Sequence, residues 1–179
     1  MSDGNDVWLA SADTIDGAYS LEGSALAGVS GYAPCLVLDD GTWYLYTSKD
    51  GDIALYTSDT VNSGYTEHAN SPLLTPEHRA GAVDYSRASE PYVFYDSDAG
   101  LWRMLYMGGD VRPAATATEY ERICMATASD PAGPWTKSNR SPLWSGVAGR
   151  YDGGYGEHRG GNEHNYPRVL RGRIAETRH

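Results

Sequence analysis

The stretch YAPCLVLDDGTWYLYTS, residues 32–48, contains two strand-forming runs joined by a tight turn. Residues 35–38 and 42–47 are rich in aliphatic and aromatic side chains, and an Asp40-Gly41 pair between such runs is a strong hairpin signal. The same order recurs at residues 92–106, where YVFY and LWRMLY flank DSDAG. Helix-length stretches lack an apolar stripe with a period of about 3.6 residues, so the sequence predicts an all-β fold.

These hairpins belong to a longer repeated unit of four short strands. Pro34, Pro91 and Pro167 mark the starts of units, and Ser24, Ser71 and Ser141 mark their ends. Such a repeat is typical of a β-propeller, whose blades are sheets of four antiparallel strands, although a β-sandwich with coincidental turns is an alternative. We expect one partial propeller domain over residues 1–179, with the rest of a first blade at 7–28, a second blade at 29–75, a third at 84–146, and a Gly/Arg/His-rich loop and the start of a fourth at 147–179.

The charge and composition exclude several classes of partner. The 179 residues carry a formal net charge of −10, which argues against binding to duplex nucleic acid or to an anionic membrane. The apolar runs are too short to span a bilayer, and no secretory leader is visible after Met1, so the compartment stays open. The two cysteines cannot form a disulfide framework, and we expect Cys35 and Cys124 to be small buried residues.

Three stretches carry a resemblance to a known group: residues 32–48, IALYTSDTVNSGYTEHANSPLL at 53–74, and ICMATASDPAGPWTKSNRSPLW at 123–144. They resemble blades of the five-bladed β-propeller glycosidases, with glycoside hydrolase family 43 closest in pattern and family 32 a cousin. The resemblance covers residues 7–145, with a weaker echo at 164–171. It implies hydrolysis of glycosidic bonds by carboxylates that converge on the central channel. One carboxyl protonates the leaving sugar and another activates water.

The resemblance also suggests which acids take part. Glu90, in Ser89-Glu90-Pro91, falls where the family has an Asp before proline in its third blade, and it is also a candidate for the acid itself. Glu163 lies four residues before Pro167, near the expected fourth-blade acid, and Glu157 is a weaker candidate. Asp84 is the third predicted catalytic residue. For Glu90, a solvated or salt-bridged carboxylate in a loop between blades is the alternative.

Five further residues are predicted to bind substrate: Tyr32, Arg87, Tyr92, Asp152 and His164. The two tyrosines flank the unit-starting prolines and could stack on a sugar ring. Arg87 could pair with Glu90, bind a substrate carboxylate, or form a surface salt bridge. For Asp152, an Asx turn is the favoured alternative. The spacing of the Glu-His dipeptides matches no standard zinc site, so no metal is assigned.

The sequence therefore predicts a glycoside hydrolase that acts on oligo- or polysaccharides. No cofactor is expected, although some members of the resembling family hold calcium on the propeller axis, with a channel histidine for which His164 is the candidate. A non-catalytic carbohydrate-binding propeller and a structural repeat module of a larger assembly are the alternatives. About three blades fit into this length whereas five close the ring, so we expect a missing segment or a partner chain to complete the propeller.

Overall fold

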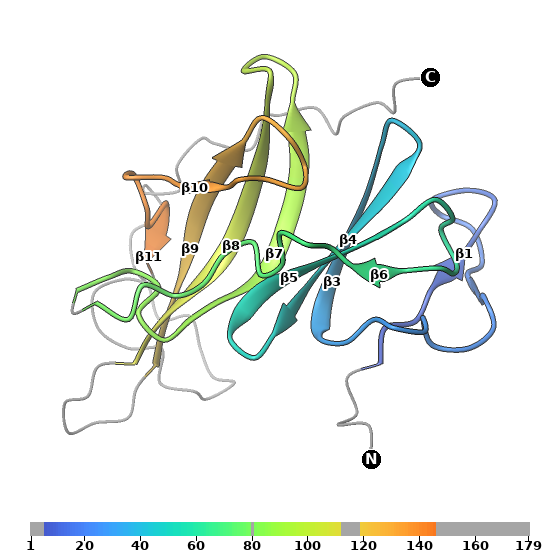
Figure 1. The fold of residues 1–179 in the computed structure, drawn as a ribbon, viewed down its shortest axis with the longest axis horizontal. Helices are drawn as coiled ribbons and strands as arrows, with labels where there is room; N and C mark the ends of the chain where they lie inside the picture. The colour runs from blue at the N-terminus through green and yellow to red at the C-terminus, as the bar shows by residue number, and fades with distance from the viewer. Residues whose placement is uncertain (1–5, 80, 112–118, 146–179) are drawn as a thin grey trace.

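The computed structural model describes residues 6–79, 81–111 and 119–145 (Figure 1). Regular structure in these residues is entirely β, in eleven strands. The described residues contain no helix that is long and apolar enough to cross a membrane. The predicted all-β class is confirmed.

The first complete sheet has four antiparallel strands in chain order. They are β3 (Tyr32–Asp39), β4 (Thr42–Lys49), β5 (Asp52–Ser58) and β6 (Thr66–Glu67). The hairpin between β3 and β4 turns at Asp40 and Gly41, both of which have positive φ, as the Asp-Gly signal predicts. Ahead of this sheet, a two-stranded sheet joins β1 (Ala10–Ser11) and β2 (Ser20–Leu21).

The second complete sheet repeats this layout. Its strands are β7 (Arg87–Asp96), β8 (Leu101–Val111), β9 (Glu119–Ala128) and β10 (Thr136–Lys137), and β11 (Trp144–Ser145) also pairs with β9. All the pairings are antiparallel. Four-stranded antiparallel sheets in succession are the architecture of propeller blades.

Matching hydrogen bonds show that the two sheets are copies of one unit. The amide of Leu55 donates to the hydroxyl oxygen of Ser71 at 3.3 Å, and the amide of Met125 donates to that of Ser141 at 3.0 Å. A few residues later, Leu73 and Leu143 donate their amides to the carbonyls of Ile53 and Ile123 at 2.8 and 2.7 Å. The serines that mark the unit ends in the sequence therefore fasten the last segment of each sheet to its third strand.

The two sheets pack against each other through β7, which lies against β3, β4 and β5 (Figure 1). The amide nitrogen of Val93 lies 3.2 Å from the sulfur of Cys35, so the first strands of the two units are in direct contact. Tyr46, Leu55 and Met104 are fully buried in the same cluster. Burial of such large apolar side chains contributes about 1.5–3 kcal/mol each.

Tryptophan side chains contribute to this packing. Trp102 and Trp135 are buried in the cluster that joins the two complete sheets. Trp43 packs instead against a second cluster, in which Val7 and Leu26 of the first segment cover the other face of the β3–β6 sheet. Cys124 is buried and Cys35 is half-buried, and both are free thiols.

Candidate functional site

The first strand of each complete sheet is interrupted at the residue before its proline. Ala33 has a φ of 48° and Glu90 a φ of 53°, and the strand pairing shifts register at both places. These are β-bulges, which bend a strand and re-aim a side chain. A glutamate rarely adopts the left-handed region, and such backbone outliers gather at functional sites. The bulge removes Glu90 from the strand ladder, and its side chain is exposed.

Glu90 is held by the neighbouring sheet. Its amide donates a hydrogen bond to the hydroxyl oxygen of Ser48, at 2.6 Å, and Ser48 is fully buried. Ser48 is also the cross-strand partner of Tyr32, whose side chain is 40 % exposed. Two of the predicted site residues, Tyr32 and Glu90, therefore lie beside the same serine, where the two sheets meet.

A groove of about 490 Å³ is lined by residues of β7, β8 and β9, and Glu90 is among them. It is lined by Glu90, Tyr92, Leu105, Tyr106, Met107, Glu121, Arg122 and Ile123. The structure thus brings Tyr92, a predicted substrate-binding residue, into the same groove as Glu90. Tyr92 is 58 % exposed, and its ring centroid lies 5.8 Å from that of Phe94.

Arg87, another predicted substrate-binding residue, lies at the start of β7. Its Nη2 donates to Oε1 of Glu121 at 2.8 Å, in a pair whose side chains are both partly exposed. Glu121 lines the groove, so the Arg87–Glu121 pair lies at its edge. A guanidinium and a carboxylate at such an edge offer both donors and acceptors to a polar ligand.

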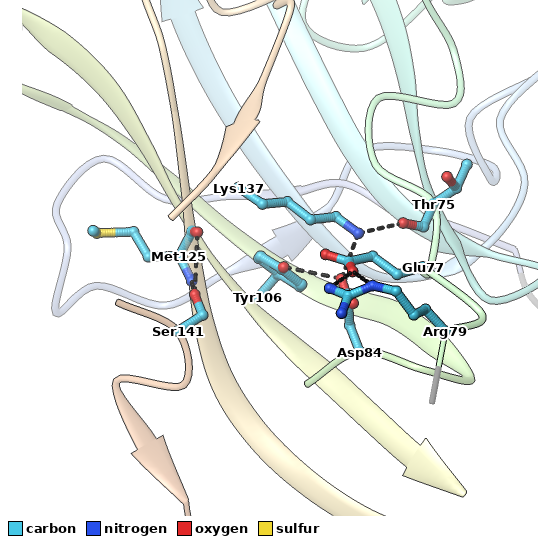
Figure 2. A network of polar contacts seen from close by, with 8 residues as sticks. All are labelled: Thr75, Glu77, Arg79, Asp84, Tyr106, Met125, Lys137 and Ser141. Carbon is cyan, nitrogen blue, oxygen red and sulfur yellow. Dashed lines mark hydrogen bonds and ion pairs between the residues drawn. The ribbon is translucent and has the colours of Figure 1, made fainter. Parts of the chain in front are cut away.

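Asp84, which the sequence predicts to be catalytic, is fully buried in a polar network (Figure 2). Its Oδ2 accepts from Nζ of Lys137 at 2.6 Å and from the hydroxyl of Tyr106 at 3.1 Å. Lys137 also donates to the backbone carbonyl of Thr75 at 2.6 Å. The network therefore fastens the segment before β7 to β8 and β10.

The geometry of this network indicates that Asp84 positions other groups. With its carboxylate fully buried, a solute reaches it only after a rearrangement. Burial, and next the nearby Asp84 carboxylate, raise the pKa of Tyr106, so its hydroxyl stays protonated and donates. Oδ1 of Asp84 has no hydrogen-bond partner among the described residues. Whether Asp84 takes part in catalysis stays a prediction.

The sequence did not single out Lys137 or Ser48, the groups that hold Asp84 and Glu90. A signal for Lys137 exists in the repeat. Lys137 pairs with Ala126 as Glu67 pairs with Tyr56, so Lys137 and Glu67 occupy equivalent positions in the two sheets. The unit that carries Asp84 therefore has a cation where the other unit has a carboxylate. Ser48 offers no such signal, because a serine at the end of a strand is common.

Three predicted residues, Glu163, Asp152 and His164, lie outside the described residues, as does Glu157. Within the described ranges, no group of three or more His, Cys, Asp or Glu side chains is placed to hold a metal ion. That no cofactor is needed stays a prediction, and the alternative of a calcium ion near His164 is likewise untested.

The fold is similar to that of solved glycoside hydrolases. A family 117 glycoside hydrolase of the marine bacterium Zobellia galactanivorans aligns with a TM-score of 0.62 and 18 % identity over 78 % of this chain and 43 % of that one. An exo-β-1,3-galactanase of Phanerochaete chrysosporium, solved with galactose, gives a TM-score of 0.49 and 17 % identity over 62 % of this chain and 26 % of that one. A thermostable family 43 glycoside hydrolase gives 0.48 and 16 % over 63 % and 33 %.

No protein-family model and no curated protein matches the sequence. The chain spans less than half the length of the three solved structures. At these identities the similarity establishes the fold. The described sheets thus have the blade architecture of the matching part of the family 117 glycoside hydrolase, as the sequence repeat predicts.

Proposed function

We propose that this chain is a glycoside hydrolase acting on oligo- or polysaccharides, and that Glu90 supplies one of its reacting carboxyls. The observation that carries the proposal is the placement of Glu90. Its exposed side chain projects from a left-handed bulge where two sheets meet and contributes to the lining of a groove. A carboxylate held on a strained but anchored backbone fits the demands of acid–base chemistry on a glycosidic bond.

In this proposal a second acid works with Glu90. Hydrolysis needs one protonated carboxyl to expel the leaving sugar and one ionised carboxyl to activate water. Glu163 is the proposed partner. For an inverting reaction the two carboxyls stand about 6.5–9.5 Å apart, which leaves room for the water. The described sheets then supply part of the sugar-binding mouth, and a further segment or a partner chain supplies the rest.

Sugar binding falls to residues around Glu90. The exposed ring of Tyr32 can stack on the apolar face of a sugar. It lies beside Ser48, which anchors Glu90, so such a sugar would be bound next to Glu90. The Arg87–Glu121 pair can exchange hydrogen bonds with sugar hydroxyls at the edge of the groove. Asp84 acts indirectly, by fastening the segment that leads into β7.

One observation favours a second candidate, a carbohydrate-binding module without catalysis. Glu121, the other carboxylate of the groove, is engaged by Arg87, so the described part of the groove does not present an acid–base pair. In such a module Glu90 and Tyr32 would bind sugar without turnover.

A hydrolysis screen on aryl glycosides with the full chain tests the proposal. Glu90→Gln should lower kcat/KM at least about a hundredfold, the usual effect of losing a positioned acid or base. Asp40→Asn is the matched control, because Asp40 also has a positive φ and lies in the turn that follows β3, away from Glu90. Equal activity of wild type and Glu90→Gln would remove Glu90 from the mechanism. Sugar binding without turnover would favour the binding module.

A further inference from the structure

Equivalent residues of the two complete sheets differ sharply in exposure. Ile53 on β5 and Ile123 on β9 accept the same hydrogen bond, from Leu73 and Leu143 respectively, and so occupy the same place in the repeat. Ile53 is fully buried, whereas Ile123 is 44 % exposed. The difference arises because the two faces of the β3–β6 sheet are both covered, while the β7–β10 sheet has one uncovered face.

The uncovered face is largely apolar. Side chains alternate along β8, so Met104 and Tyr106 are buried against the neighbouring sheet while Leu105 and Met107 point the other way and are partly exposed. We call this surface the open face; its apolar side chains are Tyr92, Phe94, Leu105, Met107, Ile123 and Met125, and Arg103 and Thr127 lie on the same side of the sheet. A largely apolar surface of this kind marks an interaction site.

The repeat shows what covers such a face. On the β3–β6 sheet the equivalent face lies under β7, the first strand of the following unit. The contact is direct at Cys35, whose sulfur lies 3.2 Å from the amide nitrogen of Val93. The strand that carries the unit-starting Pro91 therefore covers the equivalent face of the unit before it.

We propose that residues 164–171 of this chain, HNYPRVLR, cover the open face as the first strand of a further unit. The stretch holds Pro167, the third unit-starting proline. It lies within the 34 residues that follow Ser145, and Ser145 is paired with Arg122, the neighbour of Ile123. The chain thus leaves its described part at the edge of the open face.

The distribution of charge along the chain is compatible with the same occupant. Residues 150–179 carry a net charge of +2 and the preceding residues −12, with histidine neutral. The lining of the groove over the open face holds Glu121 and Arg122 as well as Glu90, the proposed reacting residue. The complementarity is therefore between a positively charged segment and the acidic remainder of the chain as a whole.

Aligning the prolines fixes the register of the contact. With Pro167 in the place of Pro91, Val169 takes the place of Val93 and Leu170 that of Phe94. Tyr92 occupies on the open face the position that Cys35 occupies on the preceding sheet. The contact between Cys35 and Val93 therefore becomes a contact between Tyr92 and Val169, and this assigns Tyr92 to packing between units in place of sugar stacking.

Disulfide trapping in the full chain tests this register independently of any glycosidase activity. Tyr92→Cys with Val169→Cys should oxidise to an intrachain disulfide, identified by peptide mapping at low protein concentration. Tyr92→Cys with Leu170→Cys is the matched control, because successive side chains of a strand point to opposite faces, and its yield should be several-fold lower. Equal yields, or no intrachain bond, would overturn the proposal. An interchain disulfide would assign the open face to a second copy instead.

A labelling experiment covers the case in which the double variants fold poorly. The thiol of Ile123→Cys should react with a maleimide about tenfold faster when Val169→Asp is added, because a charge in the contact exposes the face. Ala175→Asp, outside residues 164–171, should leave the rate unchanged. A labelling rate that Val169→Asp does not alter would contradict the proposal.

Discussion

The amide of Glu90 and the hydroxyl oxygen of Ser48 form a 2.6 Å hydrogen bond between the start of β7 and the end of β4. It joins the candidate reacting residue of one unit to a fully buried serine of the unit before. The position of the Glu90 carboxylate therefore depends on how the two sheets pack, and not on β7 alone.

Replacing Ser48 by alanine should disturb both stability and the site. The substitution leaves the Glu90 amide without its acceptor, so the free energy of unfolding should fall by about 1 kcal/mol. If Glu90 is catalytic, kcat should fall more than KM changes. Urea denaturation and steady-state kinetics measure the two effects, with Ser97→Ala in the exposed β7–β8 turn as control. If kcat is unchanged although the variant is less stable, the hydrogen bond between Ser48 and Glu90 has a structural role only.

Glycine at the two bulge positions should separate stability from function. Glycine adopts a positive φ without strain, so Ala33→Gly and Glu90→Gly should each raise the free energy of unfolding by about 0.5–1 kcal/mol. Glu90→Gly should at the same time abolish the proposed activity, whereas Ala33→Gly should keep it. Thermal unfolding and a glycoside assay read the two effects. Destabilisation by both glycines would show that the left-handed backbone carries no strain.

Removing Lys137 should destabilise the protein strongly. Lys137→Met leaves the fully buried Asp84 carboxylate without its cation, and breaking a buried pair in this way costs about 3 kcal/mol. Adding Asp84→Asn should recover part of the loss, because the amide carries no charge. Urea denaturation of the single and double variants measures both. Equal stability of wild type and Lys137→Met would contradict the role assigned to the network.

Asp96 should contribute to the decrease in the free energy of unfolding at acidic pH. Its side-chain hydrogen bond with Arg103, at 2.5 Å, and then the amide of Ala99 hold the pKa of Asp96 below its ordinary value of 3.8. A carboxyl whose pKa is lower in the folded state stabilises it above its unfolded pKa, and this stabilisation is lost as pH falls through the folded value. Arg103→Leu should therefore cost stability at pH 6 and progressively less towards pH 2.

Urea denaturation across that pH range tests the prediction, with Asp98→Asn in the same turn as control. A constant difference between wild type and Arg103→Leu would show that the loss comes from packing alone.

Cys124 should be almost inert to alkylation in the folded protein. Burial raises the pKa of its thiol to about 11, so little thiolate forms at pH 8. Iodoacetamide should modify Cys124 at least about a hundredfold faster in 6 M guanidinium, as mass mapping of the tryptic peptides would show. Comparable rates in the folded state would mean that β9 opens readily. Low native reactivity also keeps Cys124 from competing in the disulfide experiment.

The hairpins were predictable from sequence because their signal is local. The runs at 35–38 and 42–47 lie inside β3 and β4, and the Asp-Gly turn between them is where the chain turns. The strands extend further than the pattern indicates, because β3 continues through the bulge at Ala33 and Pro34. Proline ordinarily argues against a strand interior, and the bulge accommodates it.

The site was less predictable, for physical reasons that can be named. Glu90 could be singled out by its place before a repeated proline, but its left-handed backbone could not, since glutamate rarely adopts it. The burial of Asp84 could not be predicted either, because Lys137, the cation that compensates its charge, comes from a strand far along the chain. Contacts between distant segments have no signature in a local pattern.

The shared geometry of Ala33 and Glu90 has a consequence for how such a protein can change. The same backbone turn before proline exists in both units, with a methyl group in one and a carboxylate in the other. A chemical group can therefore be gained or lost at this place by one substitution, while the strands around it keep their pairing. The two described units each offer one such position, so the chemistry of the chain can diverge while its scaffold stays the same.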